Sequence, residues 1–111
     1  MAGISTHILN ASIGQPAVDV VVKLQRQSGD AYVLLATQHT DQDGRIKAFT
    51  FDQFESGDYQ LVFEVAAYFE QQQVASFYPR VCIDFKVADE TQHYHVPLLI
   101  SPFSYSTYRG S

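Results

Sequence analysis

Residues 92–111 of this chain read QHYHVPLLISPFSYSTYRGS, two apolar and aromatic segments with little charge. Chain ends usually fray, yet this one holds three tyrosines and one phenylalanine. Aromatic and β-branched residues favour strands, so we expect the last residues to pack as a strand. The Arg-Gly-Ser ending is small and polar, and its hydroxyl and carboxylate could be placed in a site.

The rest of the chain has the pattern of short strands separated by turns, with one interruption. Residues Ala66–Gln73 break the period-two alternation and have a helix-forming composition, so they predict a single short helix. Seven or eight strands at regular spacing predict an all-β fold, an antiparallel β-sandwich formed by one domain over residues 1–111. The expected strands are Thr6–Leu9, Val18–Lys23, Tyr32–Thr37, Arg45–Phe51, Tyr59–Val65, Val81–Val87, the strand containing His93 and the final strand.

Composition narrows the partners that this domain can have. The net charge is −5, which argues against nucleic acid and anionic membranes, because both require a basic face. A local cluster of cations can still bind an anionic small molecule. No apolar run reaches the length of a membrane span, and the N-terminus lacks the layout of a secretory signal. We therefore expect a cytoplasmic protein.

The single cysteine and the last two strands carry further expectations. Cys82 cannot form an internal disulfide, and its place in the apolar run Val81–Phe85 predicts a small packed side chain. The last two strands are rich in Tyr, Phe, Leu and Ile. Exposed edge strands of this kind are normally paired or covered, so we expect an oligomer.

Two histidines, His93 and His95, are separated by one residue in a predicted strand. Alternation places both on one face and Tyr94 on the other. Pro97 removes a ladder donor, which predicts that the strand is at an edge or irregular there. A pair of imidazoles suggests a metal-dependent hydrolase, but no carboxylate or cysteine joins them at ligand spacing. The ordinary interpretation of His93 is a packed or solvent-edge side chain.

Two other residues have an ordinary interpretation when they are considered alone. His7 lies in a mostly apolar strand, where a single histidine is usually a hydrogen-bonded core or edge residue. Arg45 follows Asp43-Gly44 and would ordinarily be a solvated cation beside an acidic turn. His39 is expected to be exposed. Glycine-rich phosphate loops and a nucleophile elbow are absent from the sequence.

Three motifs taken together favour a functional interpretation of His7, Arg45 and His95. They are Thr6–Asn10 with Gly14–Ala17, Thr40–Arg45, and Tyr94–Leu98 with Tyr108–Ser111. In these motifs the chain resembles the 5-hydroxyisourate hydrolases, the enzymatic members of the transthyretin-like family. The resemblance implies a transthyretin-like sandwich, with Asn10 standing where the family often has aspartate. It also implies a homotetramer, a dimer of dimers with sites at the dimer–dimer interface of a central channel.

The resemblance further implies an activity and its residues. The reaction opens the six-membered ring of 5-hydroxyisourate to 2-oxo-4-hydroxy-4-carboxy-5-ureidoimidazoline, in the degradation of urate to allantoin, without a metal or other cofactor. The implied catalytic residues are His7 and His95, which activate water and shuttle protons, with Arg45 as the substrate-binding fork and Ser111 as an orienting group. Tyr108 is implied at the channel mouth, in contact with substrate. The alternative is a transthyretin-like small-molecule carrier without catalysis. Transthyretin itself, the carrier of the family, lacks this ending and these histidines.

Overall fold

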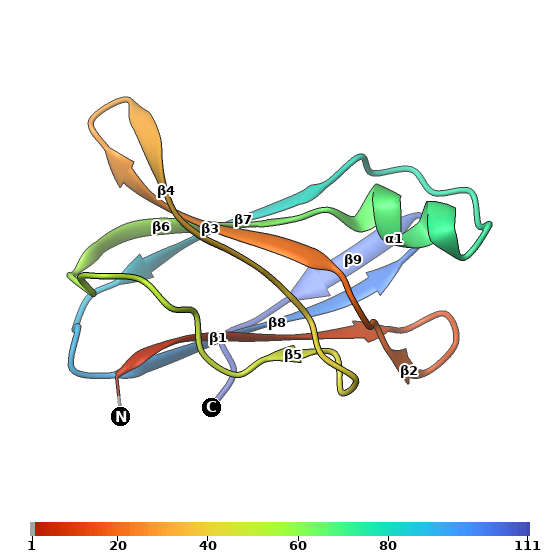
Figure 1. Ribbon diagram of the computed structural model, residues 1–111, viewed down its shortest axis with the longest axis horizontal. Helices are drawn as coiled ribbons and strands as arrows, with labels where there is room; N and C mark the ends of the chain where they lie inside the picture. The colour runs from red at the N-terminus through yellow and green to blue at the C-terminus, as the bar shows by residue number, and fades with distance from the viewer. Residues whose placement is uncertain (1) are drawn as a thin grey trace.

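The computed structural model describes residues 2–111, whose strands form two sheets packed face to face (Figure 1). One sheet has the order β2-β1-β8-β9, with β5 also paired to β1, and the other has the order β4-β3-β6-β7. A short helix, α1 (Val65–Gln71), lies at one end of the sandwich. The predicted all-β sandwich with one short helix is confirmed. The strands are β1 (Gly3–Asn10), β2 (Gln15–Pro16), β3 (Val21–Ser28), β4 (Ala31–His39), β5 (Arg45–Ile46), β6 (Gly57–Phe63), β7 (Val81–Val87), β8 (His93–Ser101) and β9 (Ser104–Thr107).

The core lies between the sheets and is built by strand alternation. In β1, Ile4 and Ile8 are completely buried, and β6 contributes Tyr59, Leu61 and Phe63. Successive side chains of a strand point to opposite faces, so each buried residue has an outward neighbour. In β8 the alternating residues Tyr94, Val96, Leu98 and Ile100 are buried in the core.

The pairing of β1 with β8 is parallel, whereas the other strand pairs within residues 2–111 are antiparallel. Its register sets Ser5 opposite His95 and His7 opposite Pro97. Residues that face each other across a ladder lie on the same side of the sheet. This pair of strands therefore places its polar side chains together on the outer face.

Of the two alternatives predicted at Pro97, an edge strand or an irregularity, the structure shows the second. β8 lies between β1 and β9. The ladder to β9 stops at the pair Leu98–Thr107, and contact resumes at a bridge between His95 and Gly110. The donor that Pro97 lacks therefore falls where β9 has already left the ladder, which explains why an interior strand tolerates proline there.

Several sequence predictions needed correction. Cys82 is exposed instead of packed, because Val81 and Val87 turn into the core and alternation sends Cys82 outward. The predicted strand Val18–Lys23 begins at Val21 and runs to Ser28. The predicted strand Arg45–Phe51 is regular for Arg45–Ile46 alone.

The side chain of Asn10 ties the first turn to the helix. Its Nδ2 donates to the Tyr68 hydroxyl at 3.0 Å, and its Oδ1 accepts from the backbone N–H of Ser12 at 3.1 Å. Asn10 is buried, and its amide has both the donor and the acceptor that these two bonds need. Across residues 2–111, no helix has the length and apolar character that a membrane crossing requires.

The turn before β5 depends on a glycine. Gly44 has φ +73°, and an added Cβ would lie 2.6 Å from the backbone oxygen of Ile8. The Asp41 carboxylate accepts from the backbone N–H of Asp43 at 2.9 Å and of Arg45 at 3.0 Å. These contacts close the turn against β1 and deliver Arg45 to the edge of that strand.

We predict that Gly44→Ala destabilises the fold much more than Gly29→Ala. Both glycines have positive φ, but nothing lies within 4 Å of a Cβ at Gly29. The Gly29 variant should lose on the order of 1–2 kcal/mol from backbone strain, whereas the Gly44 variant adds a collision with backbone. Urea unfolding followed by circular dichroism measures both, and equal midpoints for the two variants would contradict this account.

Candidate active site

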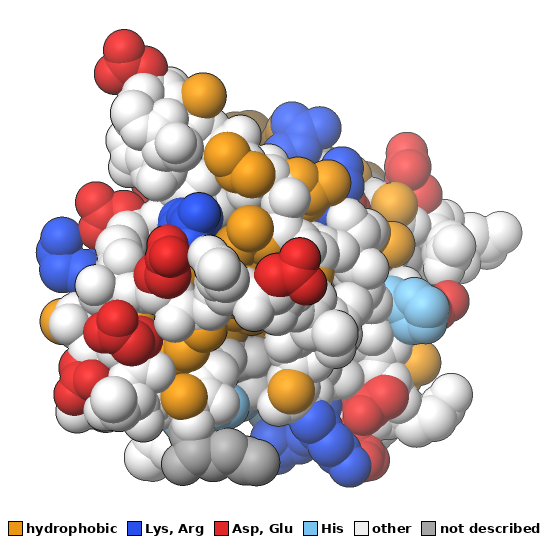
Figure 2. Space-filling model, turned by 60° about the vertical axis from the view of Figure 1, so that its left-hand side comes forward, with side chains coloured by type: hydrophobic (Ala, Val, Ile, Leu, Met, Phe, Trp, Pro, Cys, Tyr) orange, Lys and Arg blue, Asp and Glu red, His pale blue; other side chains and the backbone are white. Residues whose placement is uncertain are grey.

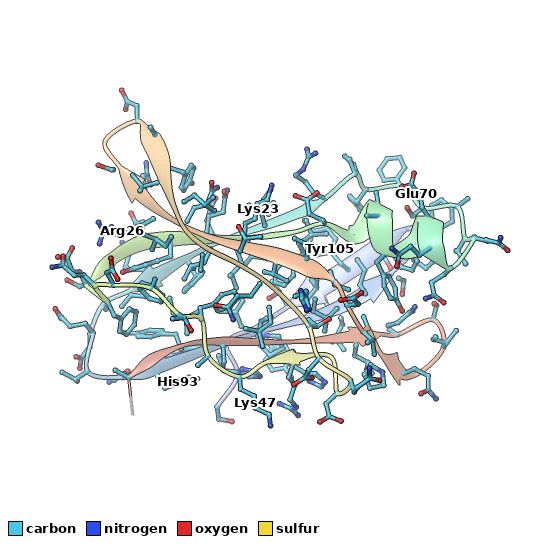
Figure 3. The ribbon with its side chains drawn as sticks, viewed as in Figure 1. Lys23, Arg26, Lys47, Glu70, His93 and Tyr105 are labelled. Carbon is cyan, nitrogen blue, oxygen red and sulfur yellow. The ribbon has the colours of Figure 1, made fainter. Side chains whose placement is uncertain are left out.

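Most of the residues that the sequence analysis singled out lie on the outer face of the sheet, on the neighbouring strands β5, β1 and β8. Ser5 and His7 come from β1, His93 and His95 from β8, and Arg45 from β5. Four of them lie in register in pairs, Ser5 with His95 and His7 with Arg45, whereas His93 lies opposite Gly3. In Figure 3, His93 and Lys47 both project from this face, away from the interior of the sandwich.

A hollow of about 250 Å³ opens on this face. Figure 2 shows a group of Lys and Arg side chains with a histidine beside it at the lower edge of the molecule. Within residues 2–111, neither Arg45 nor Lys47 forms an ion pair, so both positive charges remain available to an anion. The hollow is lined by Ser5, Thr6, Arg45, Ile46, Lys47, His93, His95 and Ser111.

The hydroxyl of Ser5 connects the two histidines of β8. Its Oγ lies 2.7 Å from His93 Nε2 and 2.7 Å from His95 Nδ1. Ser5 itself is buried. The imidazole of His95 is therefore held through its Nδ1, which leaves its Nε2 as the nitrogen available to a bound molecule.

His7 and His95 lie in a positive environment. Burial lowers the pKa of His95, and the positive charge of Arg45 lowers it further, with smaller effects of His7 and His93. Burial and then Arg45 also lower the pKa of His7, partly offset by a hydrogen bond to the Asp43 backbone and by the charges of Asp41 and Asp43. Both imidazoles are therefore biased toward the neutral form, which can accept a proton.

The end of the chain lies across β8 and reaches this hollow. The backbone N–H of Gly110 donates to the His95 carbonyl at 2.8 Å. The guanidinium of Arg109 sits over the Tyr94 ring, 4.5 Å from its centroid, and its Nη2 is 3.2 Å from the Gln92 side-chain oxygen. These contacts bring Ser111 beside His93 and His95, and Figure 1 shows the C-terminal end below the lower sheet.

Tyr108 is not among the residues that line this hollow. It lines a second, larger hollow of about 340 Å³ between β7 and β8, on the other side of the terminal segment. Its side chain is 59% exposed. The single chain thus brings Arg45, His95 and Ser111 together, with His7 beside them, and places Tyr108 in a neighbouring hollow that His95 also lines.

Sequence reasoning missed Ser5 and Lys47 and gave His93 no role. Ser5 precedes His7 by two residues, so alternation could have placed it on the same face. Its contact with His93 and His95 depends on the β1–β8 register, which the sequence does not reveal. The pair His93 and His95 gains no third ligand, because residues 2–111 contain no cluster of three His, Cys, Asp or Glu side chains suited to a metal ion.

Comparison with known proteins assigns the chain to a family. Residues 4–110 match the model of the HIUase/Transthyretin family. The chain belongs to this family. A relative named 5-hydroxyisourate hydrolase from Salmonella dublin is 43% identical over 97% of this chain and 80% of its own length.

Solved structures from both branches of the family resemble the chain. The structure of Klebsiella pneumoniae 5-hydroxyisourate hydrolase has a TM-score of 0.88 and 40% identity, and covers 100% of both chains. Sea bream transthyretin in complex with thyroxine has a TM-score of 0.89 and 33% identity, covering 96% of this chain and 93% of its own. The backbone fold is therefore equally close to the two branches, and the residues on the outer face must distinguish them.

We predict that Gly110→Ala removes Ser111 from the hollow while the fold stays intact. An added Cβ would lie 2.5 Å from His95 Cδ2 and 3.2 Å from Pro97 Cγ, so the terminal segment or the imidazole must move. The NMR signals of the His95 ring should shift, with circular dichroism unchanged. An unperturbed His95 ring would show that the end of the chain does not rest on it.

We predict that Arg45→Gln raises the pKa of both His7 and His95. The positive charge of Arg45 opposes protonation of each ring, so its removal moves both titrations to higher pH. NMR titration of the imidazole C–H signals measures this. Arg26→Gln is the matched control, since Arg26 lies in β3 of the other sheet and is ion-paired with Glu55. Unchanged titrations in the Arg45 variant would separate Arg45 from the histidines.

Proposed function

We propose that this protein hydrolyses 5-hydroxyisourate to 2-oxo-4-hydroxy-4-carboxy-5-ureidoimidazoline, a step in the degradation of urate to allantoin. The observation that carries the proposal is the convergence of His95, Arg45 and Ser111 on one hollow, with His7 opposite Arg45. The identity to relatives named for this activity supports it.

The chemistry of the ring opening fits these groups. The carbonyl under attack is already electrophilic, so the site has to supply an activated water and to stabilise an oxyanion. Neutral imidazoles at His7 and His95 are suited to take a proton from water. Arg45 presents a planar fork of donors to the oxygen-rich substrate, Lys47 adds a second positive charge, and the Ser111 hydroxyl orients the water or an imidazole.

We predict that His7→Asn and His95→Asn each abolish most of the activity while the fold stays intact. The substrate is generated in place with urate oxidase, and its ultraviolet decay is followed with and without the protein. Loss of a positioned acid–base group lowers the rate by about 10²–10⁴-fold.

Arg45→Lys should also lose most activity, because a point charge does not replace a bidentate fork.

Several outcomes of this assay would contradict the proposal. A wild-type protein that leaves the spontaneous decay unchanged would favour the carrier without catalysis. A histidine variant at the wild-type rate would remove that histidine from the mechanism. Circular dichroism of every variant provides the control for folding.

We further propose that the protein is a homotetramer, a dimer of dimers in which Tyr108 approaches the substrate at the mouth of a channel. Apolar and aromatic side chains exposed on and around β9 support this, because Phe103, Tyr105 and Tyr108 remain uncovered in the single chain. Sedimentation should give four copies at working concentration. A fully active monomer would contradict both the assembly and the role of Tyr108.

A further inference from the structure

The contact of Ser5 with His93 and His95 restricts which ring nitrogens of the two histidines can carry a proton. A hydroxyl has one hydrogen to donate and can also accept. Ser5 Oγ lies 2.7 Å from a ring nitrogen of His93 and 2.7 Å from a ring nitrogen of His95. A hydroxyl has only one hydrogen, so at most one ring accepts from Ser5 and at least one ring donates to it. The tautomers of the two histidines are therefore coupled through one side chain.

The surroundings of the two rings favour one direction for this chain of bonds. His95 is half-buried and faces the positive charges of Arg45, Lys47 and any protonated His7, with Ser111 beside it. His93 is exposed at the rim, where water can hydrate a positive charge. Burial and the charge of Arg45 oppose a positive charge on His95, whereas water can reach the ring of His93.

We propose that Ser5 and His93 are positioning residues that hold His95 with its proton on Nδ1 and relay the proton of the attacking water to His93. In the resting state, His95 Nδ1–H donates to Ser5 Oγ, and Ser5 Oγ–H donates to His93 Nε2. His95 Nε2 is left with a free lone pair directed to the substrate. This inference rests on the proposed hydrolysis and assigns His95 as its general base.

The relay balances its protons in both directions. As water attacks the ring carbonyl, His95 Nε2 takes a proton from the water, Nδ1–H passes to Ser5 Oγ, and Oγ–H passes to His93 Nε2. His93 then carries the positive charge, and His95 is neutral with its proton on Nε2. When the ring C–N bond breaks, His95 Nε2–H protonates the leaving nitrogen, and the reverse transfer from His93 through Ser5 restores the resting state. The same imidazole thus acts as base and then as acid without holding a charge beside Arg45.

The tautomer of His95 can be measured without substrate. Nitrogen-15 NMR of the imidazole rings above their titration range should find His95 protonated on Nδ1 in the wild type. Ser5→Ala should shift this population toward Nε2–H, while Ser12→Ala, a serine in the turn that follows β1, should leave it unchanged. A wild-type His95 protonated on Nε2, or a tautomer that ignores Ser5→Ala, would overturn the relay whether or not the protein is a hydrolase.

Kinetics test the relay in the working enzyme. His93→Gln keeps a hydrogen-bonding group for Ser5 but cannot accept the proton. Ser5→Ala and His93→Gln should each lower kcat by roughly 10-fold to 100-fold, below the full effect of losing an acid–base group, with little change in KM. The double variant should be no slower than the slower single variant, because residues of one relay act as a unit. His39→Gln, at an exposed histidine outside the hollow, is the matched control.

The outcomes separate the relay from the proposed function. If the wild type accelerates decay of 5-hydroxyisourate but Ser5→Ala and His93→Gln keep its kcat, the relay is wrong and the hydrolase stands. Fully additive losses in the double variant would also overturn the relay, since they indicate independent contributions. If the wild type is inactive, the proposed function fails and the NMR measurement alone decides the proton arrangement.

Discussion

The parallel register between β1 and β8 is the constraint on which the site depends. Eight residue pairs hold it, from Gly3–His93 to Asn10–Ile100. A slip by one residue would send every side chain of a strand to the opposite face, exposing buried residues such as Tyr94 and Val96 and burying His93 and His95. Burial of the inner side chains therefore fixes the register of β1 and β8, and this register determines which side chains lie together on the outer face. The free energy that holds the core together also fixes the distances between Ser5 and the two histidines.

Two glycines allow distant segments to reach that face. At Gly44 the turn before β5 presses against the Ile8 carbonyl, and at Gly110 the end of the chain lies against the His95 ring. A side chain at either position would occupy space that backbone or imidazole already fills. Arg45 and Ser111 thus arrive at the hollow because the residue next to each has no Cβ. The glycines of the Asp-Gly-Arg and Arg-Gly-Ser motifs are explained by close approach, and the Gly44 position also needs its positive φ.

Alternation accounts for the parts of the fold and site that the sequence predicted well. Val81–Val87 has the predicted bounds, and His93 shares a face with His95 as its spacing requires. What alternation leaves open is decided by long-range pairing. Pro97 indicates an edge or an irregularity, and only the pairing with β9, which leaves the ladder at that point, shows that the irregularity is what occurs. Likewise, the spacing of Ser5 from His7 indicates its face but not its contacts, because its partners are 88 and 90 residues away in the chain.

A backbone fold shared by a hydrolase and a transthyretin in complex with thyroxine implies that side chains, and not the fold, distinguish the two proteins. The residues between the sheets set the backbone, and the TM-scores of 0.88 and 0.89 to the two solved structures reflect that backbone alone. Outward side chains of β1, β5 and β8 can change without disturbing the residues packed behind them. In this chain they concentrate Arg45 and Lys47 beside two histidines whose pKa values are lowered. That surface concentrates positive charge despite a net charge of −5, and it places imidazoles biased toward the neutral form next to these cations. The cation that we propose as the substrate-binding group, Arg45, thus also lowers the pKa of the neighbouring histidines and favours their neutral form.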